Sequence, residues 1–213
     1  MNFSKENMLL YAVTDSRWVG KQTLYEQVEA ALKGGVTCLQ LREKHLSQEA
    51  FLAEALQMKA LCHRYGVPLL INDNVEIALA SQADGVHVGQ SDMEAASARA
   101  MLGPDKIVGV TARTVDQAKA AEAAGASYLG SGAVFGSTTK EDARPLDHAV
   151  LKHITEAVSI PVVAIGGITQ ENLPLLQGTG VDGVALVSTI FSAPNIESRC
   201  RELKKLSQEM VKP

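Results

Sequence analysis

The sequence predicts a single (β/α)8 barrel, and three observations support this fold. Eight short apolar runs are rich in β-branched residues, the stretches between them have helical spacing of apolar residues, and polar residues follow the ends of successive runs. In such barrels the functional groups lie at the carboxyl ends of the strands. The polar residues in these positions are therefore the candidate functional residues: Gln40, Arg42, Lys44, Asn72, Asp73, Asp92, Thr111, Lys140, Gly166, Gly167 and Ser188.

The eight apolar runs are the predicted strands, and eight is the number that a closed barrel needs. They cover residues 9–13, 38–42, 68–72, 85–88, 107–111, 128–133, 161–165 and 183–187. Helical spacing of apolar residues predicts helices in 24–32, 51–61, 115–124, 173–176 and 196–210, and two further helices are expected in 75–80 and 93–102. A loop rich in Gly, Ser, Thr and charged residues, 135–146, interrupts the alternation.

A short phrase precedes several of the predicted strands: a helix end, a glycine, a small apolar residue and then the strand. It recurs as GGVTCLQ, YGVPLLI, QADGVHV, AGASYLG and GVDGVAL. Glycine tolerates the positive φ that ends a helix, and several glycines are placed for this role: Gly34-Gly35, Gly66, Gly103, Gly125 and Gly180. The repetition predicts one βα unit that is copied around a ring.

Length and composition favour one well-buried domain over residues 1–213, since 46% of the residues are hydrophobic. The net charge of −4 is small and the longest basic run is Lys204-Lys205, which argues against binding to nucleic acids or membrane surfaces. No apolar stretch approaches the roughly 18 residues that span a bilayer, and the N-terminal segment lacks the layout of a secretory signal. We therefore expect a cytoplasmic protein.

The cysteines indicate neither a disulfide framework nor a zinc site. Cys38, Cys62 and Cys200 are far apart, odd in number and without C-x-x-C spacing, so we expect them to be reduced residues of the core or of helices. Barrels often self-associate, and a homo-oligomer is compatible with the sequence.

The second predicted strand carries the first chemically informative group. Cys38, Gln40, Arg42 and Lys44 alternate along it and so project to one side, toward the barrel axis. Two cations crowded at the mouth of a barrel are costly unless an anion neutralises them, and a diphosphate suits the guanidinium fork of Arg42 and the ammonium of Lys44. The alternative is that both cations pair with Glu43 and a neighbouring carboxylate at the rim.

Two carboxylates follow neighbouring strands, Asp73 after the third and Asp92 after the fourth. Mg²⁺ takes one or two carboxylates together with waters and substrate phosphates, so this pair is a candidate Mg²⁺ site. The alternative is capping, in which Asp73 or Asn74 starts the helix 75–80 and Asp92 starts the helix 93–102. His87, within the fourth strand, is expected to be a hydrogen-bonded core residue and not a general base.

The loop FGSTTKEDARP after the sixth strand contains groups suited to phosphate oxygens. Its hydroxyls at Ser137, Thr138 and Thr139 are followed by Lys140, and these donors can contact a ligand if the loop folds over it. The alternative is an exposed polar turn.

The segments after the seventh and eighth strands predict a second site for phosphate. Glycines in AIGGIT let the backbone approach a ligand, and Thr169 is expected to be the N-cap of the next helix. Ser188 and Thr189 follow the eighth strand. Because loops after strands seven and eight are the usual phosphate site of this fold, we expect a substrate with a phosphomonoester group there.

Taken together, the motifs resemble those of the thiamine phosphate synthase family over nearly the whole chain, in order and in spacing. They are Q-L-R-E-K (40–44), I-N-D-N (71–74), H-V-G-Q-S-D (87–92), G-V-T (109–111), S-T-T-K (137–140), A-I-G-G-I (164–168) and V-S-T-I (187–190). The resemblance implies a (β/α)8 transferase that joins hydroxymethylpyrimidine diphosphate to thiazole phosphate by a Mg²⁺-assisted dissociative substitution, giving thiamine phosphate and diphosphate. These two small molecules are the partners that it implies.

The resemblance also implies roles for the matching residues. The groups implied to act on the diphosphate and in catalysis are Arg42, Lys44, Lys140 and Thr111, and those near the pyrimidine and diphosphate are Gln40, Asn72 and Thr111. The Mg²⁺ ligands would be Asp73 and Asp92. The groups on the thiazole phosphate side would be Ser137, Thr139, Gly167, Val187 and Ser188. This chain departs from the usual family pattern at Asn74, at Thr111, where serine is common, and in the loop 136–140.

Three other functions are compatible with parts of the pattern. The thiazole tautomerase branch of the same fold depends on a histidine after the sixth strand, where this chain reads GSGAVFGSTTK and has none. A non-catalytic sensor of phosphorylated metabolites would bind thiazole phosphate without turnover. A sugar-phosphate isomerase or epimerase needs a general base at the barrel mouth, and Asp73 could serve if no metal bound there.

Overall fold

The computed structural model describes residues 3–90, 93–136 and 145–212. Eight parallel strands form a closed barrel in sequence order, and the pairing of β1 with β8 closes it. The strands are β1 (Leu10–Val13), β2 (Cys38–Leu41), β3 (Leu69–Asn72), β4 (Gly85–Val88), β5 (Ile107–Thr111), β6 (Tyr128–Gly132), β7 (Val162–Ile165) and β8 (Gly183–Leu186). The predicted barrel is confirmed, and each predicted strand lies within one residue of its expected bounds.

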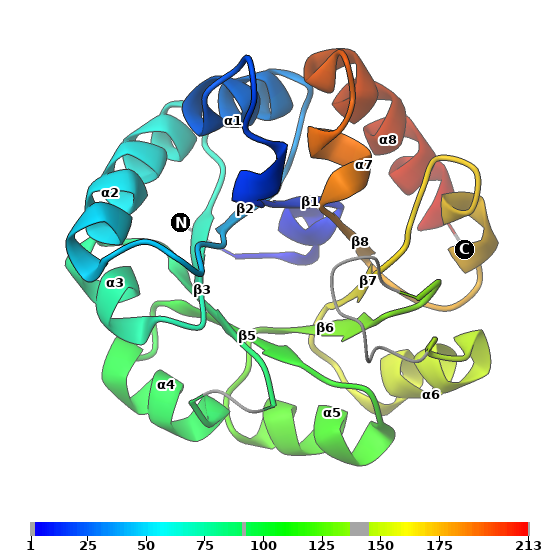
Figure 1. The fold of residues 1–213 in the computed structure, drawn as a ribbon. Coiled ribbons are helices and arrows are strands. Elements are labelled where there is room, and N and C mark those ends of the chain that lie inside the picture. Colours follow the sequence, from blue (N-terminus) through cyan, green and yellow to red (C-terminus); the bar gives the residue numbers. More distant parts are fainter. Residues whose placement is uncertain (1–2, 91–92, 137–144, 213) are drawn as a thin grey trace.

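Helices form a ring around the strands (Figure 1). The α-helices are α1 (Leu24–Lys33), α2 (Gln48–Arg64), α3 (Val75–Ala80), α4 (Ala95–Leu102), α5 (Val115–Ala123), α6 (His148–Ala157), α7 (Ser188–Phe191) and α8 (Ile196–Met210). The 3₁₀-helices are η1 (Lys5–Met8), η2 (Ser16–Trp18) and η3 (Leu173–Leu176). The predicted helices are confirmed, except that 173–176 is a 3₁₀-helix, and α6 and α7 were not predicted.

One arrangement of hydrogen bonds recurs at the amino-terminal end of the barrel. The residue before each even-numbered strand donates its backbone N–H to the carbonyl of one residue in the preceding odd-numbered strand. In return, its side-chain oxygen accepts the backbone N–H of that strand residue at 2.8 to 3.1 Å. The pairs are Thr37 with Leu10, Asp84 with Leu69, Ser127 with Val108 and Asp182 with Val162. Four of the five repeated sequence phrases contain one of these residues, which gives the repetition a structural cause.

The hydrophobic core has two parts. A large cluster fills the space between the strands and the helices, and a smaller cluster is built from side chains that point into the barrel. The smaller cluster includes Tyr11 and Tyr128, which are 1% and 0% exposed. All three cysteines are buried and free, as predicted.

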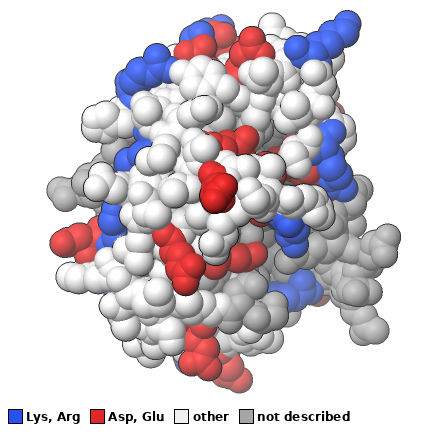
Figure 2. Space-filling model, turned by 60° about the vertical axis from the view of Figure 1, so that its left-hand side comes forward, with Lys and Arg blue, Asp and Glu red and all other residues white. Residues whose placement is uncertain are grey.

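Charged side chains of both signs are scattered over the face seen in Figure 2, with uncharged side chains between them. This distribution agrees with the small net charge of −4. An anionic ligand must therefore be held by local cations, because the face in view offers no large field of one sign. Among the described helices, none is long and apolar enough to cross a membrane.

Candidate functional site

A cavity of about 330 Å³ opens at the carboxyl ends of the strands, and all eight strands or the segments after them contribute to its lining. Ten of the candidate residues line it: Gln40, Arg42, Lys44, Asn72, Asp73, Thr111, Gly166, Gly167, Val187 and Ser188. The remaining predicted site residues, Asp92, Ser137, Thr139 and Lys140, lie outside the described residues. The fold thus brings every candidate residue that the structure describes to the lining of this one cavity.

The two cations after β2 border this cavity. The backbone N–H of Arg42 donates to Oγ1 of the buried Thr14 at 2.9 Å, which anchors the start of the segment. Within the described part of the chain, no ion pair joins Arg42 or Lys44 to a carboxylate. One carboxyl oxygen of Glu43 is buried without a hydrogen-bond partner, and burial raises the pKa of this carboxyl. The alternative in which the cations pair with Glu43 and a neighbouring carboxylate is therefore wrong for Glu43, and the described residues contain no other carboxylate paired with them.

Asp15 is a lining residue that the sequence analysis did not single out. It follows β1, is 4% exposed and accepts hydrogen bonds at 2.6 to 3.1 Å from the guanidinium of Arg17. These bonds lower the pKa of Asp15, and the nearby charge of Arg42 lowers it further. The sequence could have identified Asp15 in the same way as the other candidates, because it follows the predicted strand 9–13 by two residues.

The segment after β3 contains one residue that caps a helix and another that lines the cavity. Asn74 is the N-cap of α3 and accepts the N–H of Ile77 at 2.9 Å. Asp73 lines the cavity with φ of 61°, in the left-handed region that L-residues rarely adopt, and Asn72 Nδ2 donates to its carboxylate at 2.6 Å. Asn74 therefore takes the capping role, and the capping alternative for Asp73 is wrong.

The structure describes one carboxylate of the proposed Mg²⁺ pair. In the described residues no group of three or more His, Cys, Asp or Glu side chains could hold a metal ion. Mg²⁺ needs only one or two carboxylates when phosphates and waters complete its shell, so Asp73 beside the cavity fits this ion. α4 begins at Ala95 with Glu94 at its N-cap position, three residues and two residues after Asp92, which itself lies outside the described residues.

Polar side chains of β4 and β5 are connected by a hydrogen bond. His87 Nε2 lies 3.1 Å from Thr111 Oγ1, and His87 Nδ1 lies 2.8 Å from the hydroxyl of Tyr128. The prediction of a hydrogen-bonded His87 is confirmed, although its ring also lines the cavity. Arg113, which was not predicted, lines the cavity and donates from Nη1 to the carbonyl of Gly132 at 2.6 Å. It follows β5 by two residues, the same signal as for Asp15.

The segment after β7 approaches the cavity through its backbone. Gly167 has φ of 65°, and a Cβ there would lie 2.6 Å from the carbonyl oxygen of Phe135, so a side chain would not fit. η3 begins at Leu173, with Asn172 at its N-cap position but without a side-chain capping bond. Thr169 makes the reciprocal capping contacts one turn earlier: its Oγ1 accepts the N–H of Asn172 at 3.4 Å, and its own N–H donates to Asn172 Oδ1 at 2.7 Å. The predicted capping by Thr169 is thus found at the turn that leads into η3.

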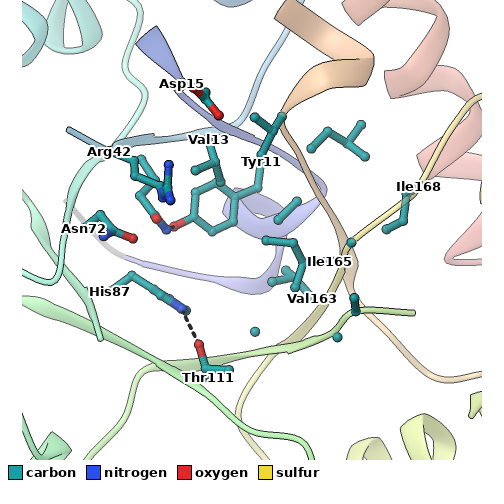
Figure 3. A pocket seen from close by; sticks show the side chains of 18 of the residues that line it. Tyr11, Val13, Asp15, Arg42, Asn72, His87, Thr111, Val163, Ile165 and Ile168 are labelled. Carbon is teal, nitrogen blue, oxygen red and sulfur yellow. Dashed lines mark hydrogen bonds between the residues drawn. The ribbon is translucent and has the colours of Figure 1, made fainter. Parts of the chain in front are cut away.

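The lining divides into a polar and an apolar half (Figure 3). Arg42, Asn72 and His87 lie on one side of the cavity, and Val163 and Ile165 lie on the other. Beyond the apolar side, the lining continues through the glycines after β7, through Val187 and through the first two residues of α7, Ser188 and Thr189. The cavity therefore suits one polar, anionic ligand group next to a second ligand with an apolar portion.

Known proteins have similar sequences and the same fold. A family profile described as thiamine monophosphate synthase matches residues 10–190. The thiamine-phosphate synthase of Clostridium acetobutylicum is 48% identical over 192 residues, which cover 90% of this chain and 91% of that one, and its counterpart from Ruminiclostridium cellulolyticum is 47% identical over 203 residues, with 95% and 97% covered. The solved thiamine phosphate pyrophosphorylase from Pyrococcus furiosus has a TM-score of 0.90 at 35% identity, with 98% of this chain and 99% of that chain covered. The chain therefore belongs to the thiamine monophosphate synthase family and is, like these relatives, a transferase.

Proposed function

We propose that the protein joins hydroxymethylpyrimidine diphosphate to thiazole phosphate, giving thiamine phosphate and diphosphate. The observation that carries this proposal is the pair of cations, Arg42 and Lys44, that borders the cavity without a carboxylate partner in the described residues. Cations in a partly desolvated cavity favour an anion that compensates them, and a diphosphate offers several negative charges and paired oxygens. Membership of the family supports the same substrate.

The polar half of the cavity is the proposed site for the pyrimidine diphosphate. Gln40, Asn72 and Thr111 present amide and hydroxyl groups there, suited to ring nitrogens and an amino substituent. Lys140, outside the described residues, is proposed as a third cation for the diphosphate. The fork of Arg42 can contact two oxygens at once, whereas Lys44 acts as a compact point charge.

The reaction needs electrostatic stabilisation more than it needs a protein base. The bond between the pyrimidine methylene carbon and the diphosphate oxygen breaks, and its electron pair leaves with the diphosphate. The thiazole nitrogen then attacks the resulting carbocation with its lone pair and forms the new C–N bond. Arg42 and Lys44 stabilise the charge that develops on the leaving group, and the cavity keeps the two reacting atoms close.

Mg²⁺ is the proposed metal, with Asp73 and Asp92 as its protein ligands. When bound, the ion would supply further positive charge beside the departing diphosphate. Asp73 is prepared for this role because Asn72 orients its carboxylate through a hydrogen bond of 2.6 Å.

The opposite half of the cavity is the proposed site for thiazole phosphate. Val163 and Ile165 offer an apolar surface for the ring, and the backbone of Gly167 together with Val187 and Ser188 lines the adjoining part. In this fold the segments after strands seven and eight are a frequent phosphate site. Ser137 and Thr139, outside the described residues, are proposed as additional contacts.

The proposal is tested by mixing the purified protein with both substrates and measuring diphosphate and thiamine phosphate, first with Mg²⁺ and then with a chelator. Product that needs both substrates and the metal is expected. Thiamine phosphate formed equally in the chelator would contradict the Mg²⁺ assignment. Binding of thiazole phosphate without turnover would favour the sensor, and isomerisation of a thiazole substrate would favour the tautomerase.

Asp73→Asn tests the metal site directly, because it keeps the shape of the side chain and removes its charge. We expect kcat/KM to fall by at least about tenfold, with higher Mg²⁺ needed for half-maximal rate, since even residues that only support metal ligands have effects of this size. Asp105→Asn is the matched control, because Asp105 is exposed and outside the cavity lining. A rate for Asp73→Asn equal to that of the control would exclude Asp73 as a ligand.

A further inference from the structure

Five side chains form a continuous line of hydrogen bonds beside the cavity, which we call the relay. Gln40 Nε2 donates to the hydroxyl of Tyr11 at 2.6 Å, and this hydroxyl is 2.8 Å from that of Tyr128. The Tyr128 hydroxyl lies 2.8 Å from His87 Nδ1, and His87 Nε2 lies 3.1 Å from Thr111 Oγ1. Four of the five line the cavity, and Tyr128, 0% exposed, lies behind them.

The interior of the barrel is shaped to accommodate the relay. A methyl group at Gly109 would overlap the ring of Tyr128, and a methyl group at Gly130 would lie 3.1 Å from His87 Cε1. Buried phenol hydroxyls are costly unless they are hydrogen-bonded, and an all-aliphatic filling is the usual solution in such barrels. Two glycines that make room for the rings of Tyr128 and His87 therefore indicate that the relay is a specific feature of this barrel and not incidental packing.

The direction of the bonds in the relay follows from the requirement that every hydrogen has an acceptor within it. The amide nitrogen of Gln40 can only donate, so the Tyr11 oxygen accepts, and the relay offers the Tyr11 hydrogen one acceptor, the Tyr128 oxygen. The single hydrogen of Tyr128 is then directed to His87 Nδ1. Burial raises the pKa of both phenols well above 10, so each hydroxyl keeps its hydrogen.

The geometry points to His87 as the tautomer that carries its hydrogen on Nε2 and donates it to Thr111 Oγ1. The hydroxyl hydrogen of Thr111 is then left to donate to an acceptor atom of the ligand. Tyr11, Tyr128 and His87 are thus positioning residues, which act through Thr111 and make this position selective for a ligand that presents a hydrogen-bond acceptor. This part of the inference rests on the proposed function, in which that ligand is the pyrimidine diphosphate.

Other protonation patterns are less favourable for the same set of atoms. If both ring nitrogens of His87 carried hydrogens, the Tyr128 oxygen would face two donors, and its own hydrogen would have no acceptor in the relay. A buried donor without an acceptor costs about 1–3 kcal/mol. If the hydrogen were on Nδ1 alone, Tyr128 would donate to Tyr11, the Tyr11 oxygen would accept from both Gln40 and Tyr128, and the Tyr11 hydrogen would have no acceptor in the relay.

The tautomer can be measured without any substrate by NMR of the ¹⁵N-labelled full-length protein. The two ring nitrogens of His87, assigned by comparison with His87→Gln, are expected to show hydrogen on Nε2 only. Tyr128→Phe removes one hydroxyl with little change of volume and should produce a mixture of tautomers, and Tyr11→Phe gives a second test of the same kind. A wild-type His87 with hydrogen on Nδ1, or on both nitrogens, would overturn the inference.

Ser131→Ala is the matched control. Ser131 lies on β6 like Tyr128 and is 0% exposed, but its hydroxyl has no hydrogen-bond partner in the described structure. Removing it should leave the His87 spectrum unchanged. A change as large as that of Tyr128→Phe would show that the spectrum reports general disturbance of β6 and would remove support for the relay.

Kinetics separate positioning through Thr111 from a merely structural role. Tyr128→Phe should lower kcat/KM for the pyrimidine diphosphate about three- to tenfold, the value of one hydrogen bond, and leave KM for thiazole phosphate unchanged. In a Thr111→Val background the same change should have no further effect, whereas an additive loss would overturn the coupling. If the protein forms no thiamine phosphate at all, the proposed function fails, and the NMR measurement still decides the relay.

Discussion

At the scale of single residues, the structure shows how a cation can be held ready for an anion. The backbone of Arg42 is anchored to Thr14, and the carboxylate of Asp15 is hydrogen-bonded to Arg17, with a smaller contribution from the charge of Arg42 to its lowered pKa. Among the described residues, Arg42 forms no ion pair with Asp15. This arrangement leaves its hydrogen-bond donors available to the proposed diphosphate.

Arg42→Lys and Arg42→Ala test this interpretation by keeping or removing the charge. Lysine retains the charge and loses the fork, so kcat/KM should fall about tenfold, and alanine should cost up to about a hundredfold, as expected for a lost charge-assisted bond. Steady-state kinetics of diphosphate release measure both effects. Lys119→Ala, which removes an exposed cation on α5, should be neutral. Equal rates for Arg42→Ala and Lys119→Ala would exclude Arg42 from the site.

The residues missed by sequence reasoning share one property, which is that their roles depend on three-dimensional neighbours. The position of Asp15 after a strand was readable, but its partner Arg17 and its burial were not. His87 was expected in the core because its sequence neighbours are apolar, and only the register of β4 against β5 places its ring beside Thr111. Position after a strand is thus a good predictor of lining residues and a poor predictor of their hydrogen bonds.

At the scale of elements, the strands were predictable because glycines and apolar runs mark their bounds, whereas the helices α6 and α7 were not predicted. The helices that precede several strands are followed by a glycine with positive φ, whereas α6 ends at Ala157 and is followed by Val158 with φ of −131°. Its helical spacing therefore lacked the stop signal that identified the others. In η3, Pro174 removes a backbone donor and the segment is only four residues long, which accounts for a 3₁₀-helix.

The reciprocal hydrogen bonds before the even-numbered strands should contribute measurably to stability. Ser127→Ala leaves the backbone N–H of Val108 without its acceptor and removes a partner of Arg99, so the free energy of unfolding should fall by about 1–3 kcal/mol. Urea denaturation measures this change. Ser131→Ala removes a buried hydroxyl without a partner from the same strand region and should be close to neutral. A larger loss for Ser131→Ala than for Ser127→Ala would contradict the role of the reciprocal bonds.

At the scale of the whole molecule, a closed barrel couples distant groups to one unfolding equilibrium. Each strand pairs with two neighbours, so no strand can leave without opening the ring. A group whose proton affinity differs between the folded and unfolded chain therefore changes the stability of the entire molecule. Two carboxyls with a raised pKa meet this condition: Glu43 after β2 and Glu54 on α2 each have an oxygen that is buried without a hydrogen-bond partner in the described structure.

Glu54 gives this coupling a measurable pH dependence. Burial and, to a smaller extent, the negative charge of Glu43 raise its pKa from 4.5 to about 7. Between these two values the folded protein binds more protons than the unfolded chain, so the free energy of unfolding should fall as the pH rises from about 4.5 to about 7. Glu54→Gln removes the group that titrates. Urea denaturation should therefore show little difference from the wild type at about pH 5 and a more stable variant at about pH 8.

Glu49→Gln provides the control for this prediction, because Glu49 is an exposed carboxylate in the first turn of the same helix. We expect its effect on stability to be similar at the two pH values, because its side chain is exposed to solvent. If Glu54→Gln also shifted stability equally at both pH values, the cause would be packing or a hydrogen bond rather than proton binding. A stabilisation confined to the higher pH would instead identify Glu54 as a buried acid that the barrel tolerates best in its protonated form.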